Sequence, residues 1–185
     1  MNGNKDAVSV LAPLFRGNQE RTPLLLLGAG ASFRSGVPTA AESVRQIARR
    51  VFSERQLQGA RPPERVKPSE WEPWLQGFPW FVHGADRLAE NFPLIVDHLL
   101  RPAEYRKEVL LDLMQPRAGI SVGYKVIADF VMRGLVNTVL TTNFDACLPD
   151  ALRGRQPHIR EINEVNRIPG DTSQFDIFSR CQIVW

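Results

Sequence analysis

Four consecutive leucines, Leu24 to Leu27, lie between Pro23 and Gly28. A short apolar run bounded by proline and glycine is typical of a strand that is buried on both faces of a parallel sheet. The small residues after it lead to Thr39 and Glu42, which stand at the spacing of a helix capping box. This order of strand, tight turn and capped helix predicts an α/β fold, because it forms the first half of a strand–helix–strand unit.

Helices and strands alternate along the rest of the 185-residue chain. An apolar stripe continues the first helix to Phe52. Two helices are predicted within 85–115, and Pro102 opens the second of them. A further helix is predicted from Ser121 to Arg133. Strand patterns cover three further segments, Leu135 to Thr142, Pro157 to Ile162 and Ile183 to Trp185. We predict a Rossmann-like three-layer α/β fold with a mainly parallel sheet.

This fold predicts one domain over residues 1–185, with a helical insertion at about 59–133, between the first helix and the strand before Thr142. The insertion begins with five prolines that disfavour long regular elements, Pro62, Pro63, Pro68, Pro73 and Pro79. Five large aromatic residues are interleaved with them, Trp71, Trp74, Phe78, Trp80 and Phe81. Two interpretations remain open. The aromatic side chains pack onto the main core, or they form a lid or a partner contact, because aromatic residues often anchor interfaces.

The composition is that of an ordinary globular protein, with a formal net charge of +3 that does not by itself indicate nucleic-acid binding. No apolar run approaches the roughly 20 residues of a membrane helix, and the polar N-terminus lacks the apolar segment of a secretory signal. The two cysteines, Cys147 and Cys181, include no CxxC pair and are too few for a zinc ribbon. We therefore expect a cytoplasmic protein with no membrane partner and no metal.

The segment between the first strand and the first helix has the composition of a phosphate-binding turn. It reads Gly28-Ala29-Gly30-Ala31-Ser32-Phe33-Arg34-Ser35-Gly36-Val37-Pro38-Thr39. Small residues let the backbone approach a pyrophosphate, and glycine adopts the φ values of a tight turn. Ser32 and Ser35 add hydroxyl donors. Phe33 stands where the usual dinucleotide fingerprint has a third Gly or Ala, so a purely structural turn is the alternative.

A second polar segment, Thr141-Thr142-Asn143-Phe144-Asp145, follows the predicted strand around Val139. Both polar segments come directly after a buried strand, so we expect them to converge at the carboxyl edge of one sheet and to hold a dinucleotide there. The alternative is that Asn143 and Asp145 only cap the helix that follows.

The two strings GAGAS-x-x-SGVPTA and TTNFD resemble the signature of the sirtuin family, over about residues 22–52 and 134–152. The resemblance implies that the protein binds NAD as its substrate. The residues expected at the dinucleotide are Gly28, Ala29, Gly30, Ala31, Ser32, Ser35, Gly36, Val37, Pro38, Thr39, Thr141, Thr142 and Asn143. It further implies catalytic roles for two residues: Asn143 lies beside the nicotinamide ribose and orients water, and Asp145 contacts the nicotinamide amide.

Two departures separate this chain from the protein deacylases of that family. Thr39-Ala40-Ala41 stands after Pro38, where deacylases have Asp-Phe-Arg, and the segment after Asp145 has no room for their four-cysteine zinc module. In these respects the chain looks like the sirtuin-like NADase effectors of bacterial anti-phage defence proteins. That resemblance implies an NAD hydrolase that releases nicotinamide and ADP-ribose, works as a homo-oligomer, and depends on a C-terminal domain or partner subunit that senses phage.

The family's catalytic histidine follows a strand that resembles the segment Cys181 to Trp185, so we expect it just beyond Trp185, in a longer parent protein. We interpret the three histidines of the chain, His83, His98 and His158, as structural or surface residues. Two other functions stay open: a non-catalytic module that binds NAD or ADP-ribose, and a sirtuin-type deacylase or ADP-ribosyltransferase that acts on protein.

Overall fold

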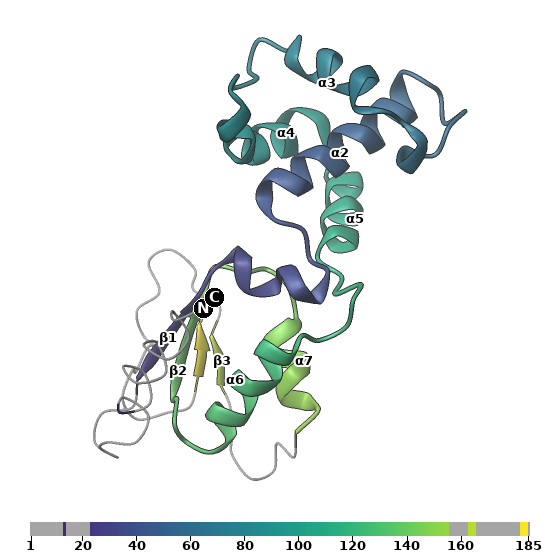
Figure 1. Ribbon diagram of the computed structural model, residues 1–185. Helices are drawn as coiled ribbons and strands as arrows, with labels where there is room; N and C mark the ends of the chain where they lie inside the picture. The colour runs from purple at the N-terminus through teal and green to yellow at the C-terminus, as the bar shows by residue number, and fades with distance from the viewer. Residues whose placement is uncertain (1–12, 14–22, 156–162, 166–181, 185) are drawn as a thin grey trace, which may run out of the picture. The chain divides into compact units, whose positions relative to one another are not determined.

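The computed structural model describes residues 13, 23–155, 163–165 and 182–184. It is a mixed α/β protein, mostly helical, with a parallel sheet (Figure 1). The chain divides into two compact units, which are treated separately below. The sheet unit comprises Met1–Ser35 and Ala118–Trp185, and the helical unit comprises Gly36–Arg117.

The sheet is built around two neighbouring parallel strands, β1 (Leu24–Leu27) and β2 (Thr138–Thr141). Leu24 is opposite Thr138 and Leu27 is opposite Thr141. The strands β3 (Asn163–Val165) and β4 (Gln182–Val184) extend the sheet in the order β1-β2-β4-β3, and every described pair is parallel. The predicted strands at Leu24 to Leu27, before Thr142 and from Ile183 are therefore confirmed, whereas the one predicted at Pro157 to Ile162 lies outside the described residues.

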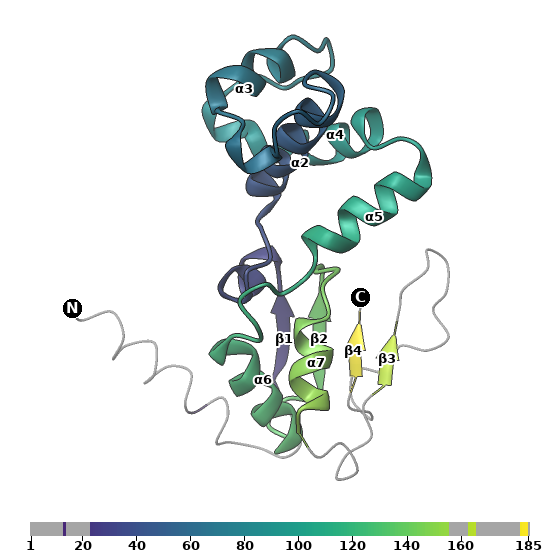
Figure 2. The same cartoon turned by 90° about the vertical axis from the view of Figure 1, so that its right-hand side faces the viewer.

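Two helices, α6 (Val122–Met132) and α7 (Cys147–Arg153), lie on the same face of this sheet (Figure 2). The helix α6 begins where predicted, because the Ser121 hydroxyl caps it by accepting from the Tyr124 N–H at 3.4 Å. Its buried side chains, Tyr124, Ala128 and Val131, follow the helical spacing of the predicted segment from Ser121 to Arg133.

The opposite face of β1 corrects one expectation. Leu24 and Leu26 are 41% and 70% exposed, so the leucine run is not buried on both faces. An unbroken apolar run predicts a strand without polar side chains, but it does not predict which face of that strand a helix covers. The described residues of the sheet unit thus form two layers, one of sheet and one of helices.

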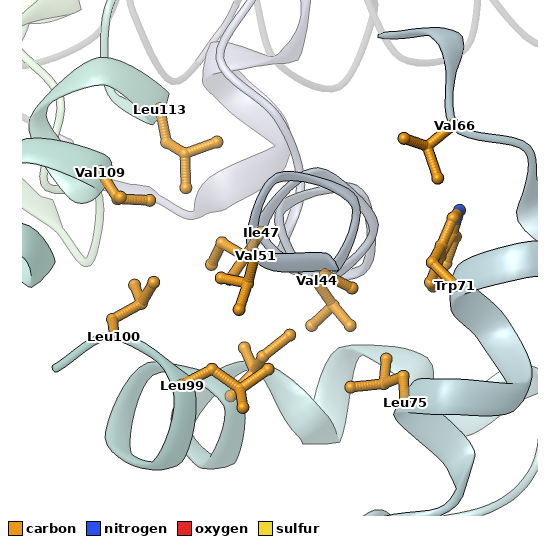
Figure 3. Close-up of a cluster of buried hydrophobic side chains, with 12 residues drawn as sticks. Val44, Ile47, Val51, Val66, Trp71, Leu75, Leu99, Leu100, Val109 and Leu113 are labelled. Atoms are coloured by element: carbon orange, nitrogen blue, oxygen red, sulfur yellow. The ribbon is translucent and has the colours of Figure 1, made fainter. Parts of the chain in front are cut away.

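The helical unit has a core of its own, around α2 (Ala40–Arg55). Its other elements are η2 (Pro63–Arg65), α3 (Pro68–Gln76), η3 (Ala85–Glu90), α4 (Asn91–Leu99) and α5 (Ala103–Leu113). Figure 3 shows α2 end-on, with side chains of the surrounding elements pointing toward it. The predicted stripe on α2 supplies the centre of this core, because Val44, Ile47, Ala48 and Val51 are buried.

The aromatic residues of the proline-rich segment pack onto that core. Trp71 is buried in it, and Trp74 meets Phe52 of α2 edge to face, with ring centroids 5.5 Å apart. Phe78 continues the contact on Trp74 at 5.1 Å, in a geometry that aromatic pairs favour. These contacts support the packing interpretation over a lid, although the core concerned belongs to the helical unit.

The prolines are less disruptive than expected, because α3 is a nine-residue helix that contains Pro73. Pro68 stands at its first position, where an N–H would have no partner within the helix. Pro73 removes one backbone hydrogen bond, and the burial of Trp71 and Leu75 on one side of the helix offsets that loss.

The bounds of the helical unit differ from those of the expected insertion, 59–133. The unit begins at Gly36 and includes the first helix, and it ends at Arg117, so that α6 belongs with the sheet.

Candidate functional site

The first motif continues β1 into a short 3₁₀ helix, η1 (Ala29–Ser35). The Ala31 N–H donates to the Gly28 carbonyl at 2.9 Å, and this bond closes the turn. Neither Gly28 nor Gly30 has a positive φ, and a Cβ built on either would meet no atom within 4 Å. The prediction that these two glycines are needed for a positive φ in the turn is therefore wrong. The left-handed conformation occurs at Gly36, where φ is 85°.

The open space beside Gly28 and Gly30 is compatible with the second expectation, that small residues here let a pyrophosphate approach the backbone. A backbone without a Cβ, with no atom of the described residues within 4 Å of where a Cβ would lie, leaves room for a bound group to approach closely. No packing contact with the described part of the chain explains why these two positions are glycine.

The two serines of the motif have different surroundings. Ser35 is fully buried, its hydroxyl accepts from the Ser121 N–H at 3.1 Å, and its carbonyl accepts from the Ala118 N–H at 3.0 Å. It therefore ties η1 to the chain entering α6. Ser32 is also buried, and its hydroxyl faces the second motif.

The second motif leaves β2 at its carboxyl end. The Asn143 N–H donates to the Thr141 hydroxyl at 3.0 Å, and the Thr142 N–H donates to the Leu27 carbonyl of β1 at 3.1 Å. Asp145 Oδ1 accepts from the Cys147 N–H at 3.0 Å, at the start of α7. The capping alternative thus holds for one oxygen of Asp145, whereas the side chain of Asn143 points elsewhere.

The two motifs meet, as expected. Asn143 Nδ2 donates to Ser32 Oγ at 3.0 Å across 111 residues of sequence, and Ser32 Oγ donates to Asp145 Oδ2 at 2.6 Å. All three side chains are buried. The contact arises because β1 and β2 are parallel neighbours, so the loops after Leu27 and Thr141 leave the sheet at the same edge.

A fourth side chain, Tyr124 of α6, completes this group and was not anticipated as a site residue. Its hydroxyl lies 2.7 Å from Ser32 Oγ and 3.2 Å from Asn143 Nδ2, and the residue is 2% exposed. The sequence signal was a tyrosine within an apolar stripe, because a buried phenol needs a hydrogen-bond partner. We call Ser32, Tyr124, Asn143 and Asp145 the polar cluster.

Two ionisable groups, the Tyr124 phenol and the Cys147 thiol beside the polar cluster, stay protonated at neutral pH. Burial, the largest cause, and a hydrogen bond with Asp145 raise the pKa of the neighbouring Cys147 thiol to about 12. Burial also raises the pKa of the Tyr124 phenol above its ordinary value, against hydrogen bonds with Ser32 and Asn143 that lower it. The site therefore offers neither a thiolate nor a phenolate at neutral pH.

One atom of the polar cluster has no hydrogen bond. Asn143 Oδ1 is buried and has no hydrogen-bond partner among the residues that the structure describes, while the Nδ2 of the same amide has two. A buried acceptor without a donor is costly, so this atom is suited to accept a hydrogen bond from a water or a ligand.

The last four residues of the first motif, Gly36 to Thr39, belong to the helical unit. Thr39 caps α2, since its hydroxyl accepts from the Glu42 N–H at 3.4 Å. Its capping box is only half formed, because the Glu42 carboxylate accepts from Arg45 and Gln46 instead of the Thr39 N–H. The structure thus gives Thr39 a local structural role.

The helical unit also holds an open pocket of about 580 Å³ between α2, η2 and α5. Of the arginines that line it, Arg50 pairs with Glu54 and Glu108, and Arg117 pairs with Asp112. The pair between Arg50 and Glu108 joins α2 to α5, so the charge of Arg50 is engaged within the unit.

His83 and His98 also lie in the helical unit, where the His98 ring stacks on Trp80 with centroids 4.9 Å apart. His158 lies outside the described residues, as does Cys181. Within the described ranges, no three His, Cys, Asp or Glu side chains are grouped as metal ligands, and no helix is long and apolar enough to cross a membrane.

The sequence matches no protein-family model and no curated protein.

Proposed function

We propose that this chain is a sirtuin-like, Rossmann-type domain that binds NAD and hydrolyses it to nicotinamide and ADP-ribose. The observation that supports this most is the 3.0 Å hydrogen bond between Asn143 and Ser32, at the carboxyl ends of two neighbouring parallel strands. Parallel α/β sheets bind their ligands outside this edge. The motifs that meet there are the two that resemble the sirtuin signature.

In this proposal the segment from Gly28 to Ser32 lies against the pyrophosphate. The absence of a Cβ at residues 28 and 30, together with the open space beside them, lets phosphate oxygens approach the backbone closely. The remaining positions of the first motif act less directly: Ser35 holds η1 in place, and Thr39 caps α2.

The chemistry suits a site built from neutral donors and acceptors. The nicotinamide of NAD is a cationic pyridinium, so it leaves without prior protonation, through a transition state that resembles an oxocarbenium ion. The protein then has to position water and stabilise charge. Asn143 Oδ1, which has no partner among the described residues, is suited to accept a hydrogen bond from that water or from a ribose hydroxyl.

The biological setting that we propose follows from the same resemblance. The domain acts as an anti-phage effector that depletes NAD, as a homo-oligomer, when a further domain or a partner subunit detects infection. Cytoplasmic location is part of this proposal.

Calorimetry with NAD and an assay of nicotinamide release together test the proposal. We expect the wild-type chain to bind NAD, and we expect Asn143→Ala in the intact protein to lower nicotinamide release by about 100-fold. Ser69→Ala, at an exposed position of α3, is the control and should keep the wild-type rate. Undiminished release by Asn143→Ala would refute the role of Asn143.

The other outcomes separate the remaining functions. NAD binding without nicotinamide release would favour a non-catalytic module that binds NAD or ADP-ribose. Release that requires an acylated lysine or a protein acceptor would favour a deacylase or an ADP-ribosyltransferase. A chain that binds no NAD would overturn the proposal altogether.

A further inference from the structure

We infer that Asp145 and Tyr124 are positioning residues: they fix the direction of every hydrogen bond in the polar cluster and so hold the Asn143 amide with Oδ1 presented to the ligand. The identity of the ligand group that donates to Oδ1 rests on the proposed function. The orientation itself follows from the hydrogen bonds alone.

The direction is set first at Asp145. An ionised carboxylate has no proton to give and only accepts. Its Oδ1 already accepts from the Cys147 backbone N–H, and its Oδ2 lies 2.6 Å from Ser32 Oγ. The single hydroxyl proton of Ser32 therefore points to Asp145, because otherwise two oxygen atoms would face each other without a proton between them.

The bond between Ser32 and Tyr124 is then determined. Their hydroxyl oxygens are 2.7 Å apart, and either could donate if this pair were isolated. Since the Ser32 proton is committed to Asp145, Tyr124 has to donate to Ser32. The phenol keeps that proton at neutral pH, because burial raises its pKa.

Asn143 follows as the third step. Ser32 Oγ and the Tyr124 hydroxyl oxygen have no proton left, and they lie 3.0 Å and 3.2 Å from the amide nitrogen. Only an NH₂ group can satisfy both of them. Rotating the amide by half a turn would place its oxygen against two acceptors, so Nδ2 is held inward and Oδ1 is the atom left unpaired.

This polarity defines the chemistry of what binds there. A buried carbonyl oxygen accepts a hydrogen bond from a hydroxyl, a water or an N–H group, and it repels the oxygen of a phosphate or a carboxylate. The subsite at Asn143 is therefore selective for a donor group, such as a ribose hydroxyl or a water, and the negatively charged part of a ligand has to lie elsewhere.

Asp145→Asn tests the inference, because it keeps the shape of the side chain and changes its hydrogen-bond direction. The introduced oxygen continues to accept from the Cys147 N–H, so the introduced NH₂ group faces Ser32 and donates to it. The Ser32 proton is then free to turn toward Tyr124 or Asn143, and the amide of Asn143 loses its fixed orientation.

The measurement is hydrogen exchange of the Asn143 side-chain NH₂ group, followed by NMR in the protein without ligand and assigned by its loss in Asn143→Ala. We expect protection in the wild type and loss of protection in Asp145→Asn. Asp150→Asn, which removes the same charge from α7, should leave the protection unchanged. Wild-type protection in a folded Asp145→Asn protein would overturn the inference.

Tyr124→Phe provides a second test, because it keeps the aromatic ring of residue 124 and the carboxylate of Asp145. It removes one of the two acceptors of the amide, so we expect partial loss of protection, between the wild type and Asp145→Asn. Should Asp145→Asn fail to fold, this variant decides alone, and unchanged protection in it would contradict the inference.

Activity separates this inference from the proposed function. If the domain hydrolyses NAD, a misplaced amide should lower kcat by about 100-fold with a smaller change in KM, in both positioning variants. A wild-type protein without NAD turnover would refute the proposed function, while the exchange measurement would still decide the orientation of Asn143.

Discussion

Ser32 donates its hydroxyl proton to Asp145 across 2.6 Å, although the two residues are 113 positions apart in the sequence. Both are buried, and each belongs to a different loop at the carboxyl edge of the sheet. The bond therefore holds the two loops of the candidate site together before any ligand arrives.

Removal of the Ser32 hydroxyl should consequently affect stability as well as ligand binding. Ser32→Ala removes the hydroxyl that donates to Asp145 Oδ2 and takes one acceptor from Asn143 Nδ2. We expect the free energy of unfolding in denaturant to fall by about 1–3 kcal/mol. Ser69→Ala at an exposed position of α3 is the control and should stay within about 0.5 kcal/mol of the wild type. Equal stability of the two variants would contradict the structural role of Ser32.

The Cys147 thiol should be unreactive in the folded protein. It is fully buried, and its pKa is raised to about 12, so almost no thiolate forms at pH 8. Alkylation quantified on the peptide that contains Cys147 should be very slow under native conditions and fast in denaturant. Rapid modification of native Cys147 would show that α7 opens readily.

The same pKa shift has a consequence for stability at alkaline pH. The unfolded thiol ionises near its ordinary value of 9.0, whereas the folded one ionises near 12. A raised folded pKa stabilises the fold fully below the unfolded pKa, and this stabilisation is lost as the pH rises from about 9 to about 12. Cys147→Ala should therefore lose less stability over that range than the wild type does.

The helix cap at Thr39 should contribute modestly and locally. Its hydroxyl accepts from the Glu42 N–H at 3.4 Å, a long bond, and the reciprocal bond of a capping box is not formed. We expect Thr39→Ala to lower stability by about 0.5–1 kcal/mol, toward the low end for helix caps. Thr39→Ser keeps the acceptor and should restore most of the loss. A larger effect on NAD binding than on stability would reassign Thr39 to the ligand.

The core of the helical unit depends on the side chains shown in Figure 3. Leu75 of α3 is 1% exposed, whereas Leu111 of α5 is 51% exposed. Leu75→Ala should therefore cost about 2–5 kcal/mol, and Leu111→Ala should cost less than about 1 kcal/mol. Thermal unfolding followed by circular dichroism compares the two. Similar losses would mean that Leu111 is covered in solution.

The local signals in the sequence predicted much of this structure. Thr39 as a cap, the stripe through Ile47 on α2 and the helix that starts at Ser121 all follow from patterns within a few residues, and the structure contains each of them. The convergence of Ser32 with Asn143 was also predictable, because parallel neighbouring strands bring their following loops to one edge.

Long-range packing explains the parts that were not predicted. The exposure of Leu26 depends on which face of the sheet a helix covers, and the helix around Pro73 persists because Trp71 and Leu75 are buried. The place of Tyr124 in the polar cluster depends on how α6 lies against the sheet, since its position in an apolar stripe predicted only a core residue.

Gly30→Ala distinguishes a ligand-binding glycine from a structural one. A methyl group at residue 30 meets none of the described atoms within 4 Å and its backbone has no positive φ, so stability should stay constant or rise by up to about 1 kcal/mol. If the open space beside it holds a pyrophosphate, the same methyl group lowers the affinity for NAD, as calorimetry would show. Gly36→Ala is the matched control in the same motif, because its φ of 85° should cost about 1–2 kcal/mol of stability whether or not NAD is present. Unchanged NAD affinity in Gly30→Ala would move the pyrophosphate away from this turn.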